Sequence, residues 1–246
     1  MKFIAGITSV TFRDKKIEEI AQLAKSNGLL AIEWGGDIHV PNKESAIVAR
    51  KTTENLGLHV SSYGSYYCLG QNQDFDKILD CAKVLNAPII RVWAGNKSPN
   101  AISEKEYEQV VFDCRAICEK AGKVNIKIGL ECHHDTLTEN RLSAVDFMSA
   151  VGNDNLYFYW QPNQFISFEE NLLSAKDLSY KTIALHVFNW DKDNKYPLAE
   201  GKEKWRAYLN VFREKNIDLP ILLEFMYDGK VEGLPNEARA LIELIK

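Results

Sequence analysis

The stretch Asn125-Ile-Lys-Ile-Gly-Leu-Glu131-Cys-His-His134 joins an apolar, β-branched run to a carboxylate, a thiol and two imidazoles. A short apolar run of this kind is typical of a strand buried on both faces, as in a parallel sheet. The groups that follow it can bind ligands and transfer protons. The chain therefore presents polar chemistry at the carboxyl end of a buried strand.

Three further stretches repeat this design. Leu222-Leu-Glu224-Phe ends a strand-like run with a carboxylate, Ile183-Ala-Leu-His186 ends one with an imidazole, and Tyr157-Phe-Tyr-Trp-Gln161 ends one with an amide. The four stretches lie far apart in the sequence. We therefore expect four strands to bring their carboxyl ends to one polar site.

Strand-like and helical patterns alternate along the whole chain. Between the strands, apolar residues recur at the spacing of a helix that lies against a sheet, as at Phe75, Ile78, Leu79, Ala82 and Leu85. The strands predicted in this way are residues 3–9, 29–34, 58–63, 88–93, 125–131, 156–161, 182–188 and 219–225.

Eight unbroken strand–helix units favour parallel strands joined by right-handed crossovers, and eight is the number that closes into a (β/α)8 TIM barrel. The 246 residues suit one such α/β domain, and no Pro/Gly/Ser-rich linker divides them, so we predict a single domain over residues 1–246. The alternative is a doubly wound open sheet. It is disfavoured because no GxGxxG or P-loop motif follows an early strand.

Composition limits the classes of partner and compartment. A net charge of −4 gives no broad basic face, so we expect no nucleic-acid partner. Thr8-Ser9 and Arg13-Asp14 end the apolar N-terminal run too early for a signal peptide, so we expect a cytoplasmic protein without a membrane partner. The five cysteines form no CxxC pair, which indicates reduced thiols.

The alternation of side chains along a strand predicts which strand-end groups face the barrel interior. Glu131, Gln161, His186 and Glu224 each end one face of a predicted strand, so all four are expected to meet at the carboxyl-terminal rim. A single glutamate at a strand end is usually a solvated residue or a helix cap. Recurrence on several strands favours instead a site for a divalent cation, namely Mn, Mg, Co or Zn.

On these motifs the sequence resembles the xylose isomerase-like TIM barrel family, and in particular its sugar phosphate isomerase/epimerase branch. The resemblance covers essentially the whole chain. It implies that Glu131, His186 in Leu-His-Val and Glu224 in Leu-Glu-Phe bind one metal ion. It also implies that Glu131 and Glu224 are the catalytic acid and base.

Three positions depart from the family pattern. Gln161 stands where the family usually has a metal-binding aspartate, and its amide oxygen brings no charge, so a weaker metal site is expected. Gln164 stands where the epimerases have a substrate-binding histidine. Lys192 stands where ketose 3-epimerases have an arginine, so a cation is retained with altered geometry.

Further residues near the strand ends are predicted to bind the substrate. Aromatic rings stack on the C–H faces of sugars, although packing is the commoner role of any single ring. Arg91, Lys192 and Lys195 are candidates for binding a phosphate, and the polar loop 191–201 is either a lid over the ligand or a solvated connection. The predicted substrate-binding residues are Glu33, Trp34, Arg91, His133, Gln164, Trp190 and Lys192.

The function predicted from these residues is a metal-dependent isomerase or epimerase of a sugar or sugar phosphate. One glutamate removes a proton next to a carbonyl and the other returns a proton. The alternatives are a dehydratase or lyase that uses the same site on a polyol or keto-sugar, and a sugar-binding barrel that has lost catalysis together with the aspartate. By analogy with the family, a homodimer is expected.

Overall fold

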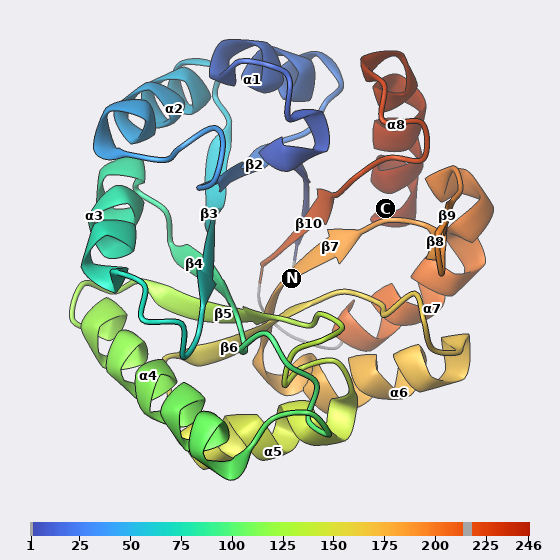
Figure 1. Cartoon of the computed structure of the whole chain (residues 1–246). Helices are drawn as coiled ribbons and strands as arrows, with labels where there is room; N and C mark the ends of the chain where they lie inside the picture. Colours follow the sequence, from blue (N-terminus) through green and yellow to red (C-terminus); the bar gives the residue numbers. More distant parts are fainter. Residues whose placement is uncertain (1, 214–217) are drawn as a thin grey trace.

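A computed structural model describes residues 2–213 and 218–246 of the chain. In these residues eight parallel strands close into a barrel, and α-helices surround it (Figure 1). The barrel strands are β1 (Phe3–Thr8), β2 (Ala31–Gly35), β3 (His59–Cys68), β4 (Ile89–Trp93), β5 (Lys127–Glu131), β6 (Leu156–Trp160), β7 (Thr182–Val187) and β10 (Leu219–Leu223).

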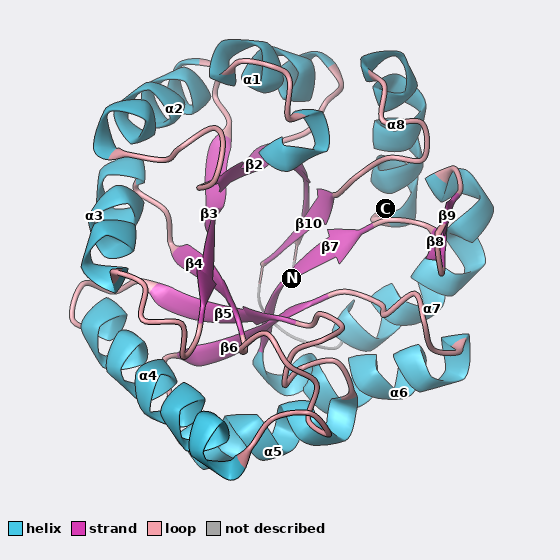
Figure 2. Cartoon of the chain, viewed as in Figure 1, coloured by secondary structure: helices cyan, strands magenta, loops and turns pink. Residues whose placement is uncertain are grey.

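The helices follow the strands in regular alternation and lie on the outside of the barrel (Figure 2). Their bounds are α1 (Ile17–Ser26), α2 (Lys43–Asn55), α3 (Phe75–Leu85), α4 (Glu104–Gly122), α5 (Arg141–Val151), α6 (Phe168–Leu178), α7 (Lys202–Arg213) and α8 (Leu234–Leu244). No helix in the described residues is both long enough and apolar enough to cross a membrane. The predicted (β/α)8 TIM barrel is confirmed.

Strand register places the carboxyl ends at one mouth. Neighbouring strands pair in the order β1-β10-β7-β6-β5-β4-β3-β2, and β2 pairs with β1 to close the ring. Inside the ring a small apolar layer fills the barrel, made of Ala31, Ile89, Tyr159, Ile183, Ala184 and Leu222. Other strand residues, such as Ile128, Phe158 and Leu185, pack in the core shared with the helices.

The third strand is longer and less regular than predicted. The sequence predicts a strand over 58–63, whereas β3 continues to Cys68, with a shift in its register against β4 between Gly64 and Tyr67. Tyr66 lies in this irregular stretch with a positive φ of 55°. The bulge breaks the strict alternation of sides, and it brings Tyr66 to the mouth.

The connection after β7 contains a structure that the sequence did not predict. Trp190–Asp191 (β8) and Asn194–Lys195 (β9) pair as a short antiparallel hairpin, and Lys192 in its turn has a positive φ of 52°. The backbone N–H of Lys192 donates to the carbonyl of Gln164, 3.1 Å away. The loops after β6 and β7 therefore contact each other at the rim.

Candidate active site at the carboxyl end of the barrel

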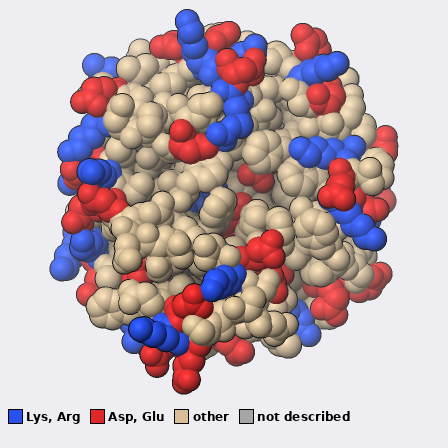
Figure 3. Space-filling view, viewed as in Figure 1, with Lys and Arg blue, Asp and Glu red and all other residues tan. Residues whose placement is uncertain are grey.

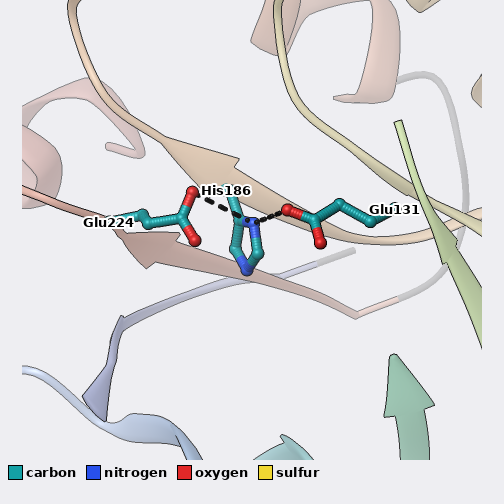
Figure 4. Close-up of side chains that lie close together, drawn as sticks. All are labelled: Glu131, His186 and Glu224. Carbon is teal, nitrogen blue, oxygen red and sulfur yellow. Dashed lines mark ion pairs between the residues drawn. The ribbon is translucent and has the colours of Figure 1, made fainter. Parts of the chain in front are cut away.

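Three side chains, each at the end of a different strand, converge on one nitrogen atom of a fourth residue, His186 on β7. His186 Nδ1 lies 2.9 Å from Gln161 Oε1, 3.3 Å from Glu224 Oε2 and 3.6 Å from Glu131 Oε1 (Figure 4 shows the two ion pairs). One ligand atom each of Glu131, His186 and Glu224 lies within 4.8 Å of the others. The structure thus brings together all four residues that the sequence predicts as metal ligands.

Glu131 is held as an ion by its neighbours. Burial disfavours its charge, but the guanidinium of Arg91 and the imidazole of His186 outweigh burial and keep the pKa of Glu131 well below its usual range. Arg91 Nη1 and Trp93 Nε1 both donate to its Oε2. Its other oxygen, Oε1, faces His186. Glu131 therefore remains a carboxylate at neutral pH and is a weak base.

Glu224 has the opposite environment. Burial raises its pKa to about 6, and the charge of Glu131 adds to this effect, while His186 opposes it. Its side chain is nearly as buried as that of Glu131, but among the described residues its ion pair is with His186. A carboxyl with a pKa near neutrality can both take up and release a proton under ordinary conditions. The two glutamates therefore differ in chemistry although they share a residue type.

His186 is fully buried between carboxylates. Burial lowers its pKa, but Glu224 and Glu33 outweigh burial and raise the value to about 10. Its Nε2 lies 3.3 Å from Glu33 Oε1. With its proton, His186 is an imidazolium that donates from both ring nitrogens. A metal ion bound at Nδ1 takes the place of one of these protons.

The donor set fits a divalent cation. Two carboxylates, one amide oxygen and one imidazole suit Mn, Mg, Co or Zn rather than a soft metal. Three buried carboxylates, Glu33, Glu131 and Glu224, together with the buried Arg91 leave two negative charges apart from His186. One divalent ion neutralises that charge. An aspartate in place of Gln161 would add another negative charge.

A cavity opens to solvent above these ligands. Its volume is about 160 Å³, similar to the roughly 150 Å³ engineered cavity that binds benzene, so one six-membered ring fits. In Figure 3 mostly uncharged side chains surround the hollow at the centre of this face, and atoms of acidic residues are visible within it. The wall includes the aromatic side chains of Tyr66, Trp93, His133, His134, Trp190 and Phe225.

Four of the predicted substrate-binding residues line this cavity, namely Arg91, His133, Gln164 and Trp190. His133 Nδ1 lies 2.7 Å from the carbonyl oxygen of His134, which can only accept, so Nδ1 donates. The lone pair of the neutral ring is then on Nε2. Arg91 is not free to bind a phosphate, because Glu33 and Glu131 already pair with it.

Three predicted substrate-binding residues lie elsewhere. The indole of Trp34 is fully buried on the outer side of β2, where it donates to Thr53 of α2, so we omit it from the site. Lys192 is exposed in the turn of the β8–β9 hairpin and does not line the cavity. The cation nearest the aromatic rim is instead Lys195, whose Nζ lies 4.6 Å from the Trp190 ring centroid. Glu33 lies beneath the cavity.

Sequence reasoning missed Tyr66. Its ring lines the cavity, and the guanidinium carbon of Arg91 lies 5.3 Å from its centroid. The available signal is the pair of aromatic residues in Ser65-Tyr66-Tyr67, which follows the predicted strand after Gly64. A strand that ends at Tyr63 leaves this run in a loop, outside the predicted barrel wall.

Comparison with known proteins relates nearly the whole chain to one family. The family model described as Xylose isomerase-like TIM barrel matches residues 9–246. Among curated proteins, 3-dehydroshikimate dehydratase of Bacillus anthracis is 26% identical over 164 residues, which cover 61% of this chain and 59% of the relative. The match thus spans less than two thirds of that relative's length.

Solved structures share the fold over nearly full length. The structure of the probable 3-DHS dehydratase AsbF of Bacillus anthracis superposes with a TM-score of 0.81 and 21% identity, covering 98% of this chain and 99% of that one. The IolI protein with a bound zinc atom superposes with a TM-score of 0.77 and 15% identity, covering 100% and 98%. At these identities the likeness concerns the fold alone.

Proposed function

The chain belongs to the xylose isomerase-like TIM barrel family, and from this premise we propose that it is a metal-dependent dehydratase of a small cyclic keto compound with several hydroxyl groups. The observation that carries the proposal is the contrast between Glu131, fixed as a carboxylate, and Glu224, whose pKa is about 6, at one imidazole. The similarity to a 3-dehydroshikimate dehydratase favours the loss of water over isomerisation.

Glu131, Gln161, His186 and Glu224 would hold the metal ion. When bound, a divalent ion supplies Lewis-acid polarisation of a carbonyl oxygen. The remaining chemistry falls to the protein's own groups. Trp93 and Arg91 fix the Glu131 carboxylate, so its free oxygen keeps one direction.

Glu224 is the group suited to move protons. As a carboxylate it accepts the proton from the carbon next to the carbonyl, and the electrons of that C–H bond form the enolate. The enolate then re-forms the carbonyl as a C=C bond replaces the C–O bond to the neighbouring hydroxyl. The new carboxyl of Glu224 gives its proton to the departing hydroxide, so water leaves and Glu224 is a carboxylate again.

The aromatic wall orients the ring of the substrate. Trp190 stacks on Phe188 with ring centroids 4.4 Å apart, and Trp93 and His133 stand 5.5 Å apart on another part of the rim. Such rings contact the apolar face of a six-membered ring, while His133 Nε2 is available to a substrate hydroxyl. A flat, ring-sized substrate therefore suits the cavity better than an extended one.

The isomerase or epimerase activity that the sequence predicted first uses the same enolate. The difference lies in its fate, since an isomerase returns the proton to carbon and a dehydratase expels the neighbouring hydroxyl. The named relative is a dehydratase, so the alternative of the sequence prediction has the better support. The sugar-binding barrel without catalysis is less well supported, because the proposed ligands converge despite Gln161.

The test compares substrates on one purified preparation. We expect Mn²⁺-loaded protein to convert 3-dehydroshikimate to an aromatic product, followed by its ultraviolet absorbance, and Glu224→Gln to abolish this conversion. Glu119→Gln on the outer face of α4 is the matched control and should behave as the unchanged protein. Exchange of ketose C–H protons in deuterated water without dehydration would instead identify an isomerase or epimerase. Binding without either reaction would identify a binding protein.

A further inference from the structure

We infer that Glu33 is a positioning residue, whose one carboxylate fixes His186 and Arg91 relative to each other, and not a ligand contact. The inference rests on the proposed metal-dependent function, because Glu33 contacts one proposed metal ligand, His186, directly and another, Glu131, through Arg91. It also changes the prediction made from the sequence, in which Glu33 bound a substrate hydroxyl.

In the part of the chain that the structure describes, the Glu33 carboxylate makes its hydrogen bonds and ion pairs inside the barrel. Its Oε1 accepts from Arg91 Nε at 3.1 Å and lies 3.3 Å from His186 Nε2, and its Oε2 accepts from Ser62 Oγ at 2.9 Å. The residue is 1% exposed and is not part of the cavity wall. A substrate in the cavity therefore has no open path to this carboxylate.

The first contact is between Glu33 and His186. A hydrogen bond to Nε2 sets the orientation of the imidazole and leaves Nδ1 directed at Gln161, Glu131 and Glu224. Partners of this kind on the remote nitrogen are a common feature of metal-binding histidines, and their loss typically weakens metal affinity. Glu33 on β2 thus directs a ligand on β7.

The second contact is between Glu33 and Arg91. Its Nε contacts Glu33 while its Nη1 contacts Glu131 Oε2, so the planar guanidinium joins the two carboxylates. This contact occupies one oxygen of Glu131 and leaves the other facing His186. The same residue of β2 therefore influences ligands on both β5 and β7.

Gly64 on β3 provides the space for this arrangement. A Cβ at Gly64 would lie 2.8 Å from Arg91 Nη2 and 2.9 Å from Glu33 Oε1, closer than real Cβ atoms come. An alanine at position 64 would displace the Glu33–Arg91 pair while every charged group is retained. Gly201 is the matched site, since a Cβ there would lie equally close, 2.8 and 2.9 Å, to the Asn189 side chain, which donates to the carbonyl of Pro197 and not to the Glu33–Arg91 pair.

The test measures metal affinity and ring geometry separately from activity. For Mn²⁺ titrated by calorimetry, we expect Glu33→Gln and Gly64→Ala to weaken binding about 10- to 100-fold, with Gly201→Ala showing no comparable loss. Circular dichroism checks folding of each variant. If Glu33→Gln fails to fold, Gly64→Ala carries the test. Unchanged Mn²⁺ affinity in the folded variants would overturn the inference.

A second measurement separates this inference from the proposed function. In metal-free protein labelled with 15N at histidine, the Nε2 resonance of His186, assigned with His186→Asn, should move in Glu33→Gln and in Gly64→Ala. One outcome is that the unchanged protein neither binds Mn²⁺ nor dehydrates 3-dehydroshikimate, while the resonance still moves in the variants. That result would reject the proposed function and retain the positioning role of Glu33. A resonance that stays in place in both variants would refute the positioning.

Discussion

The two sides of the barrel mouth hold the same residue type in contrasting electrostatic environments. On the β4–β5 side, Glu131 is paired with Arg91 and Trp93, and its pKa lies far below the usual range. On the β10 side, Glu224 is paired with His186, and burial raises its pKa to about 6. The residue type therefore does not decide the role of a carboxylate. What separates the two glutamates is the guanidinium of Arg91, which donates to Glu131 and has no hydrogen bond to Glu224 among the described residues.

The largest effect is expected when the carboxyl group of Glu224, which is proposed to transfer the proton, is removed. Glu224→Gln should lower kcat by roughly 10²- to 10⁴-fold, because an amide cannot accept the substrate proton. Steady-state kinetics at saturating Mn²⁺ would measure it. A loss that disappears when Mn²⁺ is raised further would show that Glu224 acts only as a ligand.

Removing the guanidinium of Arg91 should remove the main electrostatic difference between Glu131 and Glu224. Arg91→Met leaves the carboxylates of Glu33 and Glu131 buried without their guanidinium, and we expect a loss of about 3–5 kcal/mol in the free energy of unfolding. Urea denaturation gives the value, and Arg115→Met on α4 is the control at a partly exposed arginine. Equal losses in both variants would contradict a special role for the Arg91 network.

A smaller change sharpens the contrast by adding charge between the two glutamates. Gln161→Asp places a further carboxylate beside His186 Nδ1, and we expect Mn²⁺ to bind roughly tenfold more tightly, since affinity grows with ligand charge. Calorimetry in several buffers measures the affinity and the protons released together. Unchanged affinity would mean that the residue at 161 is not a metal ligand.

The smallest effect concerns a glutamate outside the site. Burial raises the pKa of Glu237 to about 7, and both its oxygens lie 3.2 Å from the backbone nitrogen of Leu198. Because the folded-state pKa exceeds the ordinary value, the stabilising contribution is complete at acidic pH and is lost as pH rises through about 7.

Glu237→Gln should therefore melt at a higher temperature than the unchanged protein at pH 8, by the equivalent of about 1 kcal/mol, and the difference should vanish near pH 4.5. Activity should not change, because Glu237 lies on α8 away from the cavity. A gain in melting temperature that is equal at both pH values would exclude titration of Glu237 as its cause.

The fold and the proposed ligand set were predictable from the sequence for one physical reason. Strand alternation has a period of two, so every second residue of a strand shares one face, and the sequence predicted that the faces ending in Glu131, His186 and Glu224 point inward. The same rule also bears on Glu33 and Trp34. As neighbours on one strand they point to opposite sides, so only one of them can face the interior, and the structure shows that it is Glu33.

What the sequence could not provide depends on long-range geometry. Tyr66 reaches the mouth only because β3 bulges against β4, and Lys192 is turned away by a hairpin that local patterns did not indicate. The pairing of Arg91 with two distant glutamates is a contact between strands, not a pattern within one. In the proposed reaction, the fate of the enolate would depend on where the substrate hydroxyls lie, and the strand-end residues do not encode those positions.

The apolar layer beneath the ligands, which includes Tyr159, Ile89 and Leu222, closes the barrel from below. Any molecule that reaches the proposed ligands must therefore enter from the carboxyl-terminal mouth. A substrate in the aromatic cavity would lie between the proposed metal site and bulk solvent. In the proposed reaction the metal ion would therefore bind before the substrate and leave after the product.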